Sequence, residues 1–171
     1  MKLKHTIALS AAMIASASAF AGETYESLHP GGYAIQIGPG WVAPAYYAKN
    51  NQYTVGLEVA TQQFVDNTDG SEYNNTSLGP FARYNFPLTK NTTIGPGLQY
   101  IQYYGNVDTR TYEYVVSQYV SLEYAGSPNI LIGASLQPIN YYQFNRDATS
   151  ATKNYQISVL NGGSLQITYV F

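Results

Sequence analysis

From about residue 32 to the last residue, apolar side chains recur at every second position, with small or uncharged polar residues between them. Successive side chains of a β-strand point to opposite faces, so a period of two is typical of strands. The alternation is clearest in six segments, residues 53–59, 78–86, 94–100, 112–124, 130–136 and 165–171. The pattern therefore predicts an all-β chain.

Short and long connections alternate between these segments. The short ones, residues 49–51, 89–91 and 127–129, each contain Asn, which is typical of tight turns. The long ones cover about residues 66–75, 106–111 and 145–153. This alternation predicts an antiparallel up-and-down arrangement, with short turns at one end and longer loops at the other.

The number of strands depends on the two ends of the alternating region. Residues 33–47 form either one long strand or two short strands that break at residues 38–40. Residues 155–171 form either one strand or two strands that join at residues 161–163. If the first segment is split, Phe171 lies at the same end of the barrel as the aromatic residues beside the short turns. We therefore expect that split and eight strands.

Prolines within the alternating region mark places of expected irregularity. A proline has no backbone N–H to donate to a neighbouring strand, so bulges or weakened pairing are expected near it. The sequence Ile-Gly-Pro-Gly occurs twice, at residues 37–40 where a break is predicted and at residues 94–97 inside a predicted strand. The prolines concerned are Pro39, Pro80, Pro96 and Pro138.

Composition decides which face of the strands points outward. Of the 171 residues, 45% are hydrophobic and 11% are charged, whereas soluble domains carry about 25% charged residues. The face opposite the apolar one consists mainly of Gly, Ser, Thr and Gln. This face carries too few charged residues for the exterior of a soluble barrel. The pattern instead indicates a transmembrane β-barrel with apolar side chains toward lipid and polar ones inside. Such a barrel is closed, because an open edge in hydrocarbon leaves backbone groups unpaired.

The first 21 residues have the pattern of an export signal. Lys2 and Lys4 precede an apolar stretch, and residues 19–21 read Ala-Phe-Ala, the A-x-A form of a cleavage site. We therefore expect a signal peptide over residues 1–21, an N-terminal tail over residues 22–32 and the barrel domain over residues 33–171. Loss of the two lysines leaves six basic residues against 10 acidic ones, a net charge of −4. This balance gives no electrostatic basis for binding nucleic acid.

Three charged residues fall well inside the predicted strands, and all three lie on the polar face. They are Glu58, Arg83 and Glu123. Because a charge that faces lipid at the bilayer midplane costs roughly 2 to 4 kcal/mol, we expect a charge cluster in the barrel interior, with Arg83 bridging Glu58 and Glu123. The alternative is three charges that are solvated separately at the barrel mouth.

Aromatic residues form two groups along the strands. A ring with a polar tip favours the membrane interface, so the two groups predict two aromatic belts. One group lies near the short turns or the chain end: Tyr46, Tyr47, Tyr53, Tyr84, Phe86, Tyr124, Tyr169 and Phe171. The other adjoins the longer loops: Phe64, Tyr100, Tyr103, Tyr104, Tyr112, Tyr114, Tyr141, Tyr142, Phe144 and Tyr155.

The sequence offers little for catalysis or metal binding. The chain has no cysteine, and only His29 remains after removal of the signal, in the predicted tail rather than in a strand. Asp66, Asp69 and Glu72 do not match the spacing of a calcium-binding loop, so a solvated loop is expected there. We therefore expect no catalytic residue, no metal ligand, no cofactor and no enzymatic activity.

The signal, the alternating strands and above all the C-terminus resemble the small outer-membrane β-barrels of Gram-negative bacteria, the OmpA/OmpX-like class. The residues that carry the C-terminal match are Leu165, Ile167, Tyr169 and Phe171. The resemblance implies eight strands, both termini in the periplasm and the longer loops outside the cell. It also implies contact with outer-membrane lipid and lipopolysaccharide, and a last strand that the barrel-insertion machinery recognises.

The expected function is a structural or surface-interaction role in the cell outer membrane, as a monomer. The interior of an eight-stranded barrel is just wide enough to be filled by side chains, so we expect it to be largely plugged. A narrow, porin-like passive pore or a small-molecule binding barrel is the alternative, because glycines on the polar face leave room. These glycines are Gly56, Gly79, Gly95, Gly97 and Gly133.

Overall fold

The computed structural model describes residues 31–48, 52–65, 72–105, 112–144, 155–160 and 162–171. The predicted signal peptide and most of the predicted tail, with His29, lie outside these residues. Within the described segments no helix is long and apolar enough to cross a membrane. The strands are β1 (Gly32–Gly38), β2 (Trp41–Tyr47), β3 (Tyr53–Val65), β4 (Glu72–Tyr84), β5 (Phe86–Thr89), β6 (Thr92–Gly105), β7 (Tyr112–Ser127), β8 (Ile130–Phe144), β9 (Tyr155–Val159) and β10 (Gly163–Val170).

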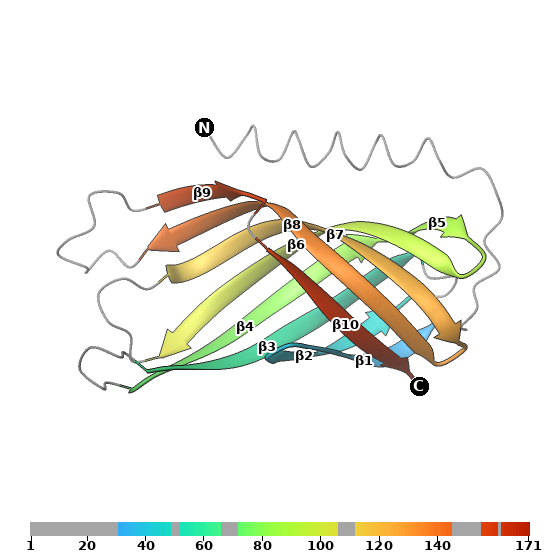
Figure 1. The fold of residues 1–171 in the computed structure, drawn as a ribbon, viewed down its shortest axis with the longest axis horizontal. Coiled ribbons are helices and arrows are strands. Elements are labelled where there is room, and N and C mark those ends of the chain that lie inside the picture. The colour runs from blue at the N-terminus through green and yellow to red at the C-terminus, as the bar shows by residue number, and fades with distance from the viewer. Residues whose placement is uncertain (1–30, 49–51, 66–71, 106–111, 145–154, 161) are drawn as a thin grey trace.

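These strands form a closed antiparallel barrel with eight positions in its wall (Figure 1). β4 and β5 both pair with β6, and β9 and β10 both pair with β8, so each of these two couples fills one position. The wall closes where β10 returns to pair with β1, with Ile37 opposite Ile167. The predicted eight-stranded, up-and-down closed barrel is confirmed.

The first alternating segment is two strands, as the preferred split at residues 38–40 predicts. β1 and β2 pair along their whole length, and the chain reverses at Pro39 and Gly40. Gly40 has a φ of 80°, a conformation that glycine adopts without the steric cost of a side chain. β1 begins at Gly32, one residue before the predicted start of the barrel. The alternative split at residues 161–163 adds no position to the wall, because β9 and β10 run in the same direction along β8.

Pro138 lies at an irregularity of the wall. The register between β7 and β8 shifts between Gln118 and Val120, next to the stretch of β8 that contains this proline. On the other side of β8, the last strand is interrupted between β9 and β10, and the Leu160 N–H donates to the Pro138 carbonyl oxygen at 2.9 Å. The expected bulge near Pro138 is therefore confirmed.

Pro80 and Pro96 weaken pairing without shifting it. Pairing of β4 with β6 skips Pro80 and resumes at Phe81 in the same register. Opposite Pro96, the strand that pairs with β6 changes from β4 to β5. The register with β6 is the same before and after this change. Residues 94–97 belong to β6, whereas the identical residues 37–40 form the end of β1 and the turn to β2.

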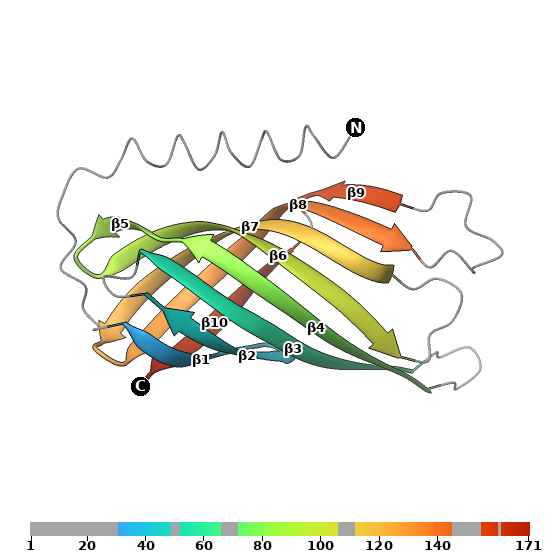
Figure 2. The same ribbon diagram turned by 180° about the vertical axis from the view of Figure 1, so that it is seen from behind.

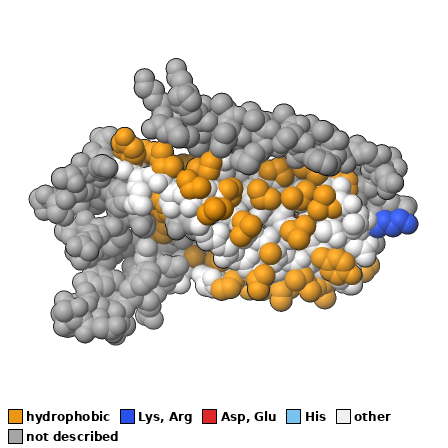
Figure 3. Space-filling view, turned by 45° about the horizontal axis from the view of Figure 1, so that its top comes forward, with side chains coloured by type: hydrophobic (Ala, Val, Ile, Leu, Met, Phe, Trp, Pro, Cys, Tyr) orange, Lys and Arg blue, Asp and Glu red, His pale blue; other side chains and the backbone are white. Residues whose placement is uncertain are grey.

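The apolar face of the wall points outward. In β10, Leu165 and Ile167 are 69% and 59% exposed, whereas Gln166 and Thr168 are 6% and 0% exposed. β1, β3, β4 and β6 alternate in the same sense. Figure 3 shows hydrophobic side chains spread over the visible wall, with a basic side chain of the described residues at the end that holds the short turns. The wall is therefore inverted relative to that of a soluble barrel.

The wall is shorter on one side. β1 and β2 have 7 residues each, whereas β3, β4, β6, β7 and β8 have 13 to 16 (Figure 2). The residues of β3 after Ala60 pair only with β4. Between Tyr155 and Gln166, β9 and the start of β10 pair only with β8. Among the described residues this leaves a notch in the wall at the long-loop end, beside the tip of the β1–β2 hairpin.

Glycines on the inner face accommodate large side chains of neighbouring strands. A Cβ atom at Gly97 would collide with the ring of Tyr119, one at Gly56 with the ring of Phe81, and one at Gly38 with the ring of Trp41. The Phe81 and Tyr119 rings in turn meet edge to face, with centroids 6.4 Å apart. The space that these glycines leave is therefore filled by aromatic rings.

This packing predicts that Gly97→Ala destabilises the barrel by about 1 to 3 kcal/mol, because the new methyl group meets both the Tyr119 ring and the Ala82 carbonyl oxygen. Gly126→Ala is the matched control, since the nearest atom to its Cβ would be 3.9 Å away. The urea midpoint of the refolded barrel in micelles measures both. Equal midpoints for the two variants would contradict the packing of the ring on Gly97.

Candidate functional site

The lumen of the barrel contains a buried ion pair between Arg83 of β4 and Glu123 of β7. Arg83 Nη2 lies 2.6 Å from Glu123 Oε1, and both side chains are at least 96% buried. Arg83 Nη1 also donates to Ser121 Oγ at 3.2 Å. Two charges removed from water require such partners, since an unpaired buried charge costs several kcal/mol.

Tyr47 of β2 joins this ion pair from the opposite wall. Its hydroxyl group accepts hydrogen bonds from Arg83 Nη2 at 2.7 Å and from Gln36 Nε2 at 2.8 Å, and donates to Glu123 Oε1 at 2.9 Å. The guanidinium carbon of Arg83 lies 5.5 Å from the centroid of the Tyr47 ring. Gln166 of β10 also donates to Glu123 Oε1, at 2.7 Å. The network therefore ties β1, β2, β4, β7 and β10 together across the lumen.

Two inner-face glycines make room for this network. A Cβ atom at Gly95 would lie 3.1 Å from Arg83 Cδ, and one at Gly133 would lie 3.1 Å from Glu123 Cγ and 2.9 Å from Gln166 Cγ. Any other residue at these positions would displace the charged side chains. The room left by Gly95 and Gly133 is therefore occupied by the network.

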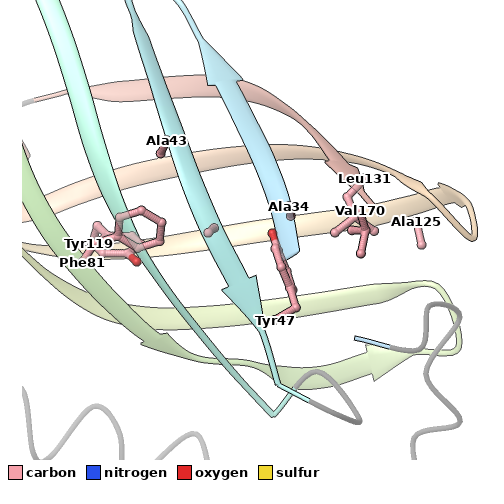
Figure 4. Close-up of a cluster of buried hydrophobic side chains, with 9 residues drawn as sticks. Ala34, Ala43, Tyr47, Phe81, Tyr119, Ala125, Leu131 and Val170 are labelled. Atoms are coloured by element: carbon pink, nitrogen blue, oxygen red, sulfur yellow. The ribbon is translucent and has the colours of Figure 1, made fainter. Parts of the chain in front are cut away.

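Below the network, toward the short turns, apolar side chains are buried in the lumen. Ala125, Leu131 and Val170 are 5%, 4% and 0% exposed and belong to one buried cluster with Tyr47. Figure 4 shows Leu131, Val170 and Ala125 gathered at one end, with Tyr47 pointing into the lumen beside Ala34. This end of the barrel is packed with side chains.

Glu58 does not join the network. Arg83 pairs with Glu123, and the expected bridge from Arg83 to Glu58 is absent among the described side chains. Glu58 Oε2 instead accepts a hydrogen bond from Gln99 Nε2 at 2.7 Å. Glu58 lies farther from the short turns than Arg83 does, since Arg83 pairs with Thr54 and Glu58 with Gly79. The difference of four residues along β3 separates the two charges.

Above the network, toward the long-loop end, the lumen holds a cavity of about 510 Å³. Its lining combines aromatic rings and uncharged hydrogen-bonding groups with two charged side chains, Glu58 and Arg83. The residues that line it are Gln36, Pro39, Trp41, Glu58, Phe81, Arg83, Gln99, Tyr119, Ser135, Gln137, Gly162, Gly163, Ser164, Leu165 and Gln166. Pro39 and Gly162 belong to the two sides of the notch, so the cavity reaches the notch.

Tyrosines on the outer wall form a continuous row near the long-loop end. The ring centroids of Tyr100 and Tyr114 are 5.5 Å apart, those of Tyr114 and Tyr141 are 6.4 Å apart, and those of Tyr141 and Tyr155 are 6.1 Å apart. The row crosses four neighbouring positions of the wall, from β6 to β9. The side chains of Phe64, Tyr112 and Phe144, predicted for the same group, lie outside the described side chains.

One member of the group near the short turns, Tyr47, faces the lumen, and another, Phe86, is buried. Most of its members are exposed on the outer wall, but Tyr47 and Phe86 are 1% and 4% exposed. Tyr46 and Tyr47 are neighbours in one strand, so only one of them can face outward. Phe86 follows the break between β4 and β5 and packs against Tyr84, with ring centroids 4.7 Å apart. The prediction of Tyr47 as a belt residue is therefore corrected.

The four residues of the C-terminal match all lie on the outer face. Leu165, Ile167, Tyr169 and Phe171 are each exposed, and Tyr169 meets Phe171 edge to face at 5.2 Å. The Phe171 N–H donates to the Tyr33 carbonyl oxygen at 2.9 Å, which fixes the chain end against β1.

No group of three or more His, Cys, Asp and Glu residues that could hold a metal ion occurs among the described residues. Asp66 and Asp69 lie outside those residues, as does His29. The chemistry that the described lumen offers is therefore hydrogen bonding, ion pairing and aromatic contact.

The alternation of inward and outward side chains predicts part of this site from the sequence, because it assigns Tyr47, Gln166 and Gln36 to the inner face. It does not indicate their distances across the lumen. Those depend on strand tilt and on which wall positions face each other, and neither has a local signal in the sequence.

The ion pair predicts that Arg83→Leu destabilises the folded barrel by about 3 to 5 kcal/mol, because Glu123 keeps its charge and loses its cation. Adding Glu123→Gln to Arg83→Leu is expected to recover part of the loss. Urea midpoints of the single and double variants in micelles measure this coupling, with Lys90→Leu in the β5–β6 turn as the control. If the stability losses of the two single variants simply add up in the double variant, the ion pair is contradicted.

Comparison with models of known protein families and with curated proteins finds no match for this chain. What the barrel does is therefore inferred from its own wall and lumen. Three features carry that inference: an apolar outer wall, a lumen packed at the short-turn end, and a cavity at the other end.

Proposed function

We propose that this chain is a β-barrel of the bacterial outer membrane, reached after export through the periplasm. Its role is structural or one of surface interaction, with the barrel held in lipid and the longer loops at the cell surface in contact with lipopolysaccharide. The protein acts as a monomer and catalyses no reaction. The observation that carries this proposal is the inverted wall, with apolar side chains outside and polar ones inside.

The exposed apolar surface is the strongest support for a lipid environment. Leu57, Leu98, Leu122 and Ile132 are 38%, 47%, 47% and 54% exposed, on four different strands. Soluble monomers rarely expose contiguous apolar patches larger than a few hundred Å². Closure of the wall between β1 and β10 also pairs two strands that would otherwise be open edges, which is a requirement for a structure that spans hydrocarbon.

Aromatic residues support an orientation in the membrane. The row from Tyr100 to Tyr155 near the long-loop end, and Tyr169 with Phe171 near the short turns, lie on the outer wall where interfacial belts are found. The exposed, alternating residues of the last strand are available to the barrel-insertion machinery. We therefore propose that the short turns lie in the periplasm and the longer loops outside the cell.

A small-molecule binding barrel is the second candidate, and the cavity favours it over a passive pore. The cavity volume of about 510 Å³ lies in the range of ligand pockets. A pore needs a continuous path, and the Tyr47 network with the apolar cluster beneath it fills the lumen between this cavity and the short turns. Binding from the long-loop side is thus compatible with a plugged barrel.

Membrane fractions test the location. The full chain, expressed in a Gram-negative host, is expected in the outer-membrane fraction and is expected to change its electrophoretic mobility on boiling. Recovery as a dispersed monomer in detergent-free buffer would contradict the proposal.

A pair of lysine substitutions tests which face meets lipid. Leu98 and Gln99 are neighbours in β6 at the same depth, and they face outward and inward respectively. Leu98→Lys is expected to lower the free energy of unfolding in lipid vesicles by about 2 to 4 kcal/mol. Gln99→Lys is expected to cost much less, because the new ammonium group faces the Glu58 carboxylate. Equal losses would mean that the faces are wrongly assigned.

Planar bilayers test the plug. The purified barrel is expected to give no stable open conductance, because Tyr47, Arg83 and Glu123 cross the lumen. Tyr47→Ala removes the residue that bonds to both walls and is expected to produce intermittent openings. A steady conductance of the unmodified barrel would favour the pore.

A further inference from the structure

The lumen cavity contains a carboxylate without a cationic partner. Glu58 Oε2 accepts a hydrogen bond from Gln99, and Oε1 has no hydrogen-bond partner among the described residues. Arg83, the cation of the same lumen, is committed to Glu123 at 2.6 Å. Arg83 also lines the cavity, but the Arg83–Glu123 pair has no net charge, so Glu58 is the charged lining residue without an ion-pair partner among the described residues.

Aromatic residues flank this carboxylate on both neighbouring strands. Glu58 pairs with Gly79 of β4, and Phe81 is the next residue of β4 on the same face. On the other side, Ala60 is the next inner-face residue after Glu58 and pairs with Trp41 of β2. Diagonal neighbours of this kind lie about 7 to 8 Å apart, within reach of aromatic side chains. Trp41 and Phe81 both line the cavity, and Tyr119 lies against Phe81.

A negative charge with aromatic residues on both neighbouring strands has a preferred ligand chemistry. The face of an aromatic ring attracts cations, Trp most strongly, and quaternary ammonium ligands are bound in this way in many proteins. A carboxylate adds a direct charge interaction. The opposite wall presents Ser135, Gln137 and Ser164, which bring hydrogen-bonding groups but no charge. An anionic ligand would be repelled by Glu58, and a purely apolar ligand would leave Glu58 desolvated.

We infer that the lumen cavity binds a small organic cation, with the ammonium group against Glu58 and between the rings of Trp41 and Phe81. The ligand reaches the cavity from the long-loop end, where the short β1–β2 hairpin leaves the notch. This inference goes beyond the proposed function and rests on the barrel fold rather than on location in a membrane.

The test uses the refolded barrel in a non-ionic polyoxyethylene detergent, at mildly alkaline pH and low salt. Trp41 is the only tryptophan of the chain, so its fluorescence reports on the cavity directly. Choline is the cationic probe, and 3,3-dimethylbutan-1-ol is its uncharged analogue of the same shape. Choline is expected to change the Trp41 emission saturably, and the uncharged analogue is expected to bind at least about tenfold more weakly.

Glu58→Gln keeps the shape of the side chain and removes its charge. It is expected to weaken choline binding about tenfold or more, while a heat-dependent shift in electrophoretic mobility verifies that the variant is folded. Phe81→Leu is expected to weaken binding several-fold, and Tyr100→Leu, which changes a ring on the outer wall, is expected to leave it unchanged.

Three results would overturn the inference. They are no choline binding by a folded barrel, equal binding of choline and the uncharged analogue, and unchanged choline affinity in Glu58→Gln. None of these results depends on whether the chain fractionates with the outer membrane. Failure of this inference is therefore distinguishable from failure of the proposed location.

Discussion

Closure of the wall between β1 and β10 is the constraint on which the rest of the structure depends. Four residue pairs, from Ala34–Val170 to Ile37–Ile167, complete the hydrogen-bonded cylinder. Asn129 of the β7–β8 turn reinforces the seam, since its Nδ2 donates to the Val170 carbonyl oxygen at 2.7 Å. Once the cylinder is closed, each residue faces either outward or into the lumen, and a shift by one residue would exchange the two sets.

A closed wall of eight positions leaves a narrow lumen, and that narrowness explains how the interior is filled. Arg83 and Glu123 are both buried there and pair with each other, and Tyr47 and Gln166 add hydrogen bonds to the pair. Glycines at positions 95 and 133 admit the charged side chains, and those at 56 and 97 admit aromatic rings. At the long-loop end, the short β1–β2 hairpin leaves the lumen unfilled beside Glu58.

The two copies of Ile-Gly-Pro-Gly show how far local sequence reaches. At residues 37–40 the chain turns, and Gly40 takes a positive φ with open space around it. At residues 94–97 the same four residues continue β6, and their pairing with β7 is uninterrupted. Side chains of β4 and β7, together with that of Asn85 between β4 and β5, cover Gly95 and Gly97. The prolines predicted irregular pairing in both places. Whether the chain reverses there depends on the neighbouring strands.

Sequence alone determined most of the strand segments and which of their faces is apolar, because a period of two is a local property of each segment. It favoured eight positions in the wall but left open whether the first or the last segment splits. It also determined that Glu58, Arg83 and Glu123 share the inner face. Only the tertiary structure decided that Arg83 pairs with Glu123 rather than Glu58, that Tyr47 crosses the lumen, and that a cavity remains above them. These depend on register, on tilt and on the unequal heights of neighbouring strands, which bring together residues as far apart in sequence as Tyr47 and Glu123.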